Sequence, residues 1–117
     1  MDAERIKEIF EPFARVETKR MFGAVGIYRD GLCFAMAESG DIFIKTDDET
    51  REIFRAAGSR PFVYVMRGKP QEMNYWRLVD DALDDGAELK RWAGLGFAAA
   101  TRAAAKKPAK KVSRKTK

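Results

Sequence analysis

The sequence predicts an α+β domain of two layers, in which helices cover one face of an antiparallel sheet. The 117 residues suffice for one ordinary domain, and 45% of them are hydrophobic, enough for a packed core. Tight turns separate consecutive strand-like segments, which implies antiparallel pairing, and helical segments stand before, between and after them. The predicted order of elements is α-β-β-β(-β)-α-β-β-α.

The first half of the chain shows a helix followed by short strands. Pro12, which has no N–H to donate, ends or bends that helix, and residues 18–22 form a short strand. Asp30-Gly31 tolerates the positive φ angles of a type I′ turn, so the apolar residues on either side of it predict a hairpin. The helix is predicted from apolar residues at helical spacing, namely Ile6, Ile9, Phe10 and Phe13.

The second half adds a helix, a hairpin and a last helix. Residues 42–44 form a strand, and Thr46-Asp47-Asp48-Glu49 is a capping box that predicts a helix start, with the Thr46 hydroxyl accepting the amide of the third helical residue. Residues 62–67 and 71–78 form two strands joined at Gly68-Lys69-Pro70. The last helix starts near Asp85, and its glycines are expected to pack closely against the sheet.

The charges divide the chain into a body and a tail. Residues 1–101 hold 15 basic and 18 acidic residues, a net charge of −3, and residues 102–117 carry +8 with no acidic residue. We therefore predict a folded domain over 1–101 and a disordered basic tail over 102–117. The basic residues of the tail are Arg102, Lys106, Lys107, Lys110, Lys111, Arg114, Lys115 and Lys117.

Two functions of the tail remain open. Lys and Arg side chains neutralise phosphates and release counterions, so the tail could give non-specific affinity for nucleic acid. It holds no aromatic residue to stack on bases, so sequence-specific recognition is not expected. The alternative is a tail that only increases solubility.

Composition excludes several kinds of site. Without histidine, the chain has no Ser-His-Asp triad and no His-ligated metal, and one cysteine cannot form an intrachain disulfide. Gly23-Ala24-Val25-Gly26 does not match the dinucleotide fingerprint. Cys33 is interpreted as a core thiol rather than a nucleophile. Capping explains the carboxylates that could otherwise form a metal or hydrolase site, which are Asp80, Asp81, Asp84 and Asp85.

We consequently predict no catalytic, cofactor-binding or metal-binding residue, and no cofactor. No apolar run reaches the roughly 20 residues that span a bilayer. The charged N-terminus does not resemble a signal peptide, so the expected location is the cytoplasm.

Two segments, residues 20–23 and residues 73–77, combine apolar, aromatic and guanidinium groups, the types enriched at protein interfaces. They make up a candidate partner surface, and the alternative is that they are core strands with Met73 and Tyr75 on one face and Trp76 on the other. A dimer built through such a surface is a further alternative. The candidate partner surface consists of Arg20, Met21, Phe22, Tyr75, Trp76 and Arg77.

The body resembles the TfoX N-terminal domain family over about residues 8–100. The resemblance rests on Arg20-Met21-Phe22-Gly23, residues 26–31, Phe62-Val63-Tyr64, Gly68-Lys69-Pro70 and residues 73–78, with Ala24 where the family often has a second glycine. It implies a two-layer α+β fold similar to secretion-chaperone-like folds. Longer members regulate natural competence in bacteria with other transcription factors and carry a second domain that this sequence lacks. The family has no known catalytic residues, so none is carried over.

The sequence therefore favours a non-enzymatic, bacterial regulatory or interaction module with an unidentified protein partner. The alternative is a small-ligand-binding protein or an enzyme that uses carboxylate, tyrosine or arginine groups in a pocket at the sheet edge.

Overall fold

The computed structural model describes the backbone of residues 1–21 and 23–115, and the side chains of residues 1–20 and 23–106. Within these ranges, six antiparallel strands form one sheet in the order β1-β2-β3-β4-β6-β5, which confirms the predicted α+β class. The first half contains α1 (Ala3–Phe10), β1 (Glu17–Met21), β2 (Ala24–Arg29), β3 (Leu32–Glu38) and β4 (Asp41–Lys45). The second half contains α2 (Arg51–Ala56), β5 (Pro61–Met66), β6 (Lys69–Arg77), α3 (Asp81–Asp84) and α4 (Gly86–Lys115).

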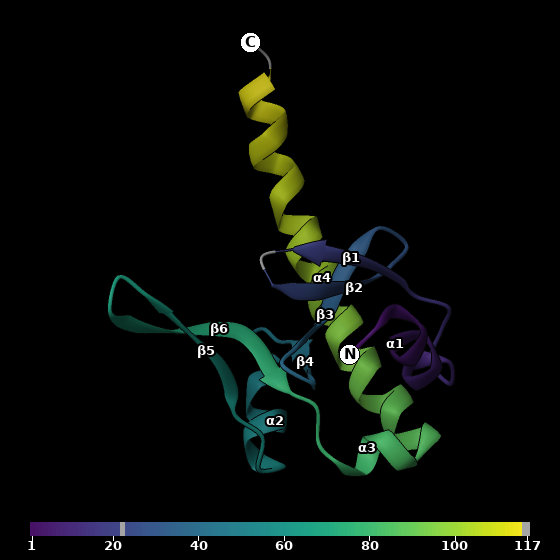
Figure 1. Ribbon diagram of the computed structural model, residues 1–117. Coiled ribbons are helices and arrows are strands. Elements are labelled where there is room, and N and C mark those ends of the chain that lie inside the picture. Colours follow the sequence, from purple (N-terminus) through teal and green to yellow (C-terminus); the bar gives the residue numbers. More distant parts are fainter. Residues whose placement is uncertain (22, 116–117) are drawn as a thin grey trace.

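The helices α1 and α4 lie over the same face of the sheet (Figure 1). The core between the layers centres on Phe34 of β3, whose ring meets Phe10 of α1 at 5.5 Å and Phe97 of α4 at 6.1 Å in edge-to-face contacts. Gly96 allows α4 to approach the sheet, because a Cβ there would lie 2.5 Å from Ile44 Cγ2 and 2.9 Å from the Phe34 carbonyl oxygen. The predicted close packing is confirmed for Gly96 and is wrong for Gly94, where an added Cβ would meet nothing within 4 Å.

Local sequence rules explain the first helix and the first predicted hairpin. The Asp2 carboxylate accepts a hydrogen bond from the Arg5 amide at 2.9 Å, which caps α1. Asp30 and Gly31 have φ angles of 51° and 80°, as the predicted type I′ turn between β2 and β3 requires. The apolar stripe of α1 is buried as predicted.

The start of α2 differs from the prediction. The Thr46 hydroxyl does not cap the helix; it is buried without a hydrogen-bond partner. Instead the Asp47 carboxylate accepts hydrogen bonds from the amides of Glu49 and Thr50, and the Thr50 hydroxyl accepts one from the Asp47 amide. The capping group lies one residue later because Thr46 still pairs with the sheet, donating its amide hydrogen bond to the Asn74 carbonyl. This turn delays the helix to Arg51.

The last helix extends past the predicted domain boundary. It begins after Asp85, whose carboxylate accepts from the Ala87 and Glu88 amides, as predicted. It continues past residue 101 to Lys115, so the first residues of the predicted disordered tail are helical instead. Alanine and lysine are among the strongest helix formers, which explains the continuation as far as Lys107. This tendency does not explain Pro108, which has no amide hydrogen to donate to the helix. The side chains of residues 107–117 lie outside the described part of the chain.

Candidate functional site

The two halves of the candidate partner surface lie far apart. Arg20 is on β1, at one edge of the sheet, whereas Tyr75, Trp76 and Arg77 are on β6. Three strands, β2, β3 and β4, stand between them, each adding about 4.8 Å to the separation. The side chain of Met21 and all of Phe22 lie outside the described residues. The structure therefore does not join these segments into one patch.

Trp76 corrects the prediction, because it belongs to the core. Its side chain is 4% exposed, and its register with Ile44 of β4 directs it to the face that α4 covers. The Arg55 guanidinium lies 5.2 Å from its ring centroid and covers the remaining side. A partner could not reach Trp76 without opening the core, which agrees with the alternative of core strands.

Arg77 has structural partners on two neighbouring elements. Its guanidinium lies 3.0 Å from the Asp80 carboxylate and 3.5 Å from that of Asp41 on β4. Asp80 was expected to cap a helix, but its side chain makes no capping hydrogen bond and pairs with Arg77 instead. These ion pairs connect β4, β6 and the segment before α3.

Tyr75 points to the opposite face of the sheet from Trp76 and meets Cys33 there. The Tyr75 hydroxyl donates to the Cys33 sulfur at 3.6 Å, and Tyr28 pairs with Cys33 across β2 and β3. Burial, and secondarily the neighbouring Cys33, raises the pKa of both tyrosines above the usual range. Cys33 is half-buried and donates to the Ala35 carbonyl at 3.4 Å. The prediction of a core thiol is therefore corrected, because Cys33 is only half-buried and lies on the less covered face of the sheet, outside the core cluster.

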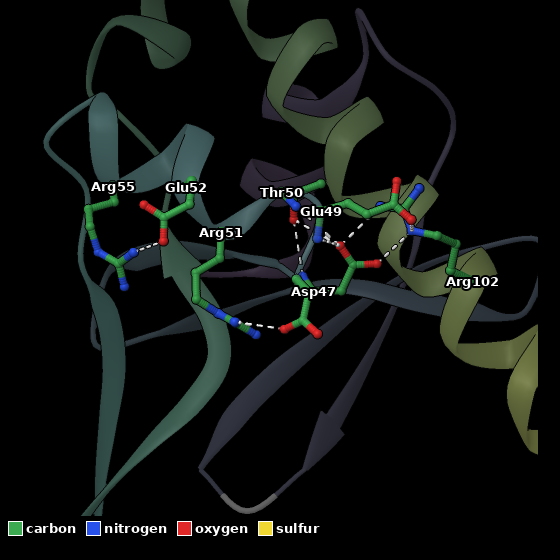
Figure 2. Close-up of polar contacts among 8 residues, drawn as sticks. Asp47, Glu49, Thr50, Arg51, Glu52, Arg55 and Arg102 are labelled. Atoms are coloured by element: carbon green, nitrogen blue, oxygen red, sulfur yellow. Dashed lines mark hydrogen bonds and ion pairs between the residues drawn. The ribbon is translucent and has the colours of Figure 1, made fainter.

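An acid–base cluster joins α4 to the turn before α2 (Figure 2). Arg102 Nε lies 2.6 Å from Asp47 Oδ2, Arg102 Nη2 lies 3.1 Å from Asp47 Oδ1, and Glu49 is 3.2 Å from the same guanidinium. The hydrogen bond from Arg102 lowers the pKa of Asp47, although burial opposes this effect. Two ion pairs lie within α2 and its preceding turn, Arg51–Asp48 and Arg55–Glu52. Figure 2 shows Arg51, Glu52 and Arg55 on the side of the cluster away from Arg102.

Arg102 thus belongs to the body rather than to a free basic tail. Its side chain is two-thirds buried, and its guanidinium forms an ion pair and hydrogen bonds with Asp47, which is 55 residues away in the chain. Lys106, four residues later, is exposed on the same helix. The predicted nucleic-acid-binding residues Lys107, Lys110, Lys111, Arg114, Lys115 and Lys117 have side chains outside the described residues.

A cavity of about 570 Å³ lies beside this cluster. Thr46, whose hydroxyl has no hydrogen-bond partner, contributes to its wall, and so do Asn74 and Ala99. Charged groups of both signs surround it, although apolar atoms, among them those of Ala99, Ala103 and Ala105, make up the larger part of its wall. These charged residues are Lys45, Asp47, Asp48, Glu49, Arg51, Arg102 and Lys106.

The carboxylates near α3 do not converge. Among residues 1–20 and 23–106, no group of three or more acidic or cysteine side chains is placed to hold a metal ion. Asp85 caps α4, as expected. Within the described residues, no helix is long and apolar enough to cross a membrane.

Sequence comparison places the fold in a family. The profile of the TfoX N-terminal domain matches residues 8–100, which include all elements from the end of α1 to most of the buried part of α4. No curated protein matches the chain significantly. Because the match covers most of the sequence, and because the element order agrees with the one predicted from the sequence pattern apart from the additional helix α3, this chain belongs to the TfoX N-terminal domain family.

Proposed function

We propose that this protein is a non-enzymatic regulatory or interaction module, linked to transcription regulation, whose basic C-terminal segment adds non-specific affinity for nucleic acid. The observation that carries the proposal is the family match over residues 8–100, followed by a segment in which every charged residue is basic. A bacterial cytoplasmic location belongs to the same proposal, because nucleic acid is the proposed ligand and bacterial nucleic acid lies in the cytoplasm.

The arrangement of α4 supports separate roles for body and tail. Figure 1 shows α4 leaving the sheet and carrying its C-terminal end (yellow) away from the other elements. Arg102 is held by Asp47 at the point of departure, so seven basic residues, Lys106 onward, remain for phosphates. The body, with a net charge of −3 over residues 1–101, repels phosphate backbones. Nucleic acid is therefore expected to contact the segment after residue 105.

The side chains of this protein give the reasons for proposing a non-enzymatic role. The chain contains no histidine, the usual general base near neutral pH. The hydrogen-bond partners of the half-buried Cys33 are a hydroxyl and a carbonyl, and neither is a cation that would stabilise a thiolate.

Affinity capture from source-cell lysate tests the regulatory part. The full chain and a chain ending at Ala105 serve as baits, each with and without nuclease. A protein partner that is retained by both baits after nuclease treatment supports an interaction module in the body. Recovery of nucleic acid alone, lost with the shorter bait, would contradict the interaction role of the body and leave only that of the tail.

One observation favours a second candidate, a small polar ligand in the cavity beside Thr46. A buried hydroxyl without a partner costs free energy, and a polar molecule in the cavity could satisfy it once the wall around Thr46 opens, because the hydroxyl has almost no accessible surface. Native mass spectrometry of the protein purified from its source would show a mass increment that disappears in Thr46→Val. No increment in the wild-type chain would contradict this candidate.

A further inference from the structure

The hairpin β5–β6 forms an arm that projects from the sheet. β4 pairs with β6 over Tyr75–Arg77, and one further hydrogen bond joins the Thr46 amide to the Asn74 carbonyl, whereas β5 pairs with β6 as far as Met66 and Lys69 at the turn. Between Asn74 and the turn, this hairpin is therefore a two-stranded ribbon, and Figure 1 shows it extending away from the helices and from β1 to β3. Every residue from 63 to 74 is exposed.

The arm exposes apolar side chains on both of its faces. Val63 and Val65 are 48% and 64% exposed and share one face, because residues two apart in a strand point the same way. Tyr64 and Met66, 46% and 49% exposed, share the other face. A two-stranded ribbon is at best marginally stable alone in water, so these side chains are expected to gain from a covering partner.

The outer edge of the arm is open and carries no charge. β5 is the last strand of the sheet, and its sequence Pro61-Phe62-Val63-Tyr64-Val65-Met66 contains no ionisable group except the Tyr64 phenol. Natural edge strands usually carry lysine, an inward-pointing charge or a central proline, which prevent pairing with another strand. β5 has none of these within residues 62–66.

The turn fixes which backbone groups point outward. Arg67 and Gly68 have φ angles of 55° and 78°, so the two-residue loop is of type I′ and the flanking pair Met66–Lys69 is hydrogen-bonded. Pairs alternate along an antiparallel ladder, so Val65–Pro70 and Val63–Glu72 are non-hydrogen-bonded pairs. The N–H and C=O groups of Val63 and Val65 consequently point away from β6, toward the open edge.

We propose that β5 pairs antiparallel with β5 of a second copy of this chain, about a twofold axis at Tyr64. In this register Val63 lies opposite Val65 of the second copy, and the reverse pair forms on the other side of the axis. All outward-pointing N–H and C=O groups of both valines find partners, and the two Tyr64 side chains become direct cross-strand neighbours. The two sheets become one continuous sheet across the dimer. This inference does not rest on the proposed regulatory function.

A second copy fits this edge because the edge is complementary to itself. A strand without charged side chains meets no like charge when it pairs with its own copy, and twofold pairing satisfies both strands equally. A register shifted toward the N-terminus would place Val65 opposite Pro61, which has no N–H to donate. A shift the other way would place Val63 opposite Arg67, which lies in the turn. The Tyr64-centred register alone uses both valines.

Disulfide trapping tests the register. In a Cys33→Ser background, Tyr64→Cys places two thiols at directly opposed positions, where mild oxidation is expected to give a covalent dimer on a non-reducing gel. Ile53→Cys on α2, 36% exposed and away from the arm, is the control and is expected to stay monomeric. Equal cross-linking of both variants, or no cross-linking of Tyr64→Cys, would overturn the proposed register.

Sedimentation equilibrium tests the interface itself. The nuclease-treated full chain is expected to show a concentration-dependent monomer–dimer equilibrium, and Val65→Lys is expected to sediment as a monomer because charges on an edge block pairing. Leu83→Lys on α3, 45% exposed, introduces the same charge elsewhere and is expected to leave the dimer intact. Both sites are exposed, and circular dichroism verifies the fold. A wild-type chain that remains monomeric at all concentrations overturns the proposal. The open edge of β5 would then be available for pairing with a strand of another protein.

Discussion

Arg102 and Asp47 connect the last helix to the turn between β4 and α2 through two hydrogen bonds of 2.6 and 3.1 Å. The same Asp47 carboxylate accepts the amides of Glu49 and Thr50, so one side chain both shapes the turn and anchors α4. Through this contact the body extends to residue 102, one residue into the segment whose charges are all basic.

Replacing Arg102 by alanine is expected to lower the free energy of unfolding by about 1 kcal/mol. The ion pair is bidentate and both partners are about two-thirds buried, which places it above an ordinary surface pair. Urea unfolding of the full chain measures the change. Arg5→Ala, which breaks the exposed pair with Glu8 on α1, is the control, with an expected loss below about 0.5 kcal/mol. Equal losses in the two variants would contradict the anchoring role of Arg102.

Acidification is expected to remove the contribution of the same pair. The hydrogen bond from Arg102 lowers the pKa of Asp47 in the folded state, so the stabilisation is full above the usual aspartate pKa of about 3.9. It is lost as the pH falls through the lower folded-state pKa, because folding then no longer favours the ionised carboxylate. The stability difference between wild type and Arg102→Gln should therefore shrink from about pH 7 to about pH 2. A constant difference over this range would show that the pair is not the cause.

The two glycines near the middle of α4 are expected to respond oppositely to alanine. Gly96→Ala should destabilise the chain by about 1–3 kcal/mol, because the new Cβ would collide with Ile44 and the Phe34 carbonyl. A methyl group at Gly94 would have nothing within 4 Å, so Gly94→Ala should stabilise by about 0.5–1 kcal/mol through helix propensity. Thermal unfolding compares the two. Stabilisation by both substitutions would mean that α4 does not approach the sheet at Gly96.

Two buried threonines near the start of α2 form a second matched pair. Thr46→Val is expected to stabilise the chain by about 1 kcal/mol, because the lost hydroxyl has no hydrogen-bond partner. Thr50→Val is expected to destabilise by about 1–2 kcal/mol, because the Thr50 hydroxyl accepts from the Asp47 amide. Urea unfolding of both variants measures the difference. If Thr46→Val is instead the more harmful change, its hydroxyl has a partner in solution.

The sequence predicted elements whose determinants are local. The Asp30-Gly31 turn and the Asp85 cap each depend on neighbouring residues, and both formed as predicted. The family resemblance, confirmed over residues 8–100, depends on several short motifs in a fixed order.

Features that depend on distant residues were missed. No local pattern relates Arg102 to Asp47, so the change in composition at residue 102 looked like the end of the fold. The helix-forming tendency of the alanine-rich stretch after Thr101 could have indicated that α4 continues. Similarly, the hairpin of residues 62–78 was predicted, but its projection depends on where β4 ends, at Lys45. Trp76 became core because its register with Ile44 directs it toward α4.

Nucleic-acid binding as a function of salt tests the proposed role of the basic segment most directly. Fluorescence anisotropy with a labelled DNA duplex compares the full chain, a chain ending at Ala105, and a chain with residues 106–117 in scrambled order. We expect the full and scrambled chains to bind alike, with log affinity falling against log salt at a slope no steeper than about −6, since seven cations are available. The shorter chain should not bind. We predict that the tail binds nucleic acid non-specifically and that the body repels phosphate. Undiminished binding by the shorter chain, or loss of binding on scrambling, would contradict this prediction.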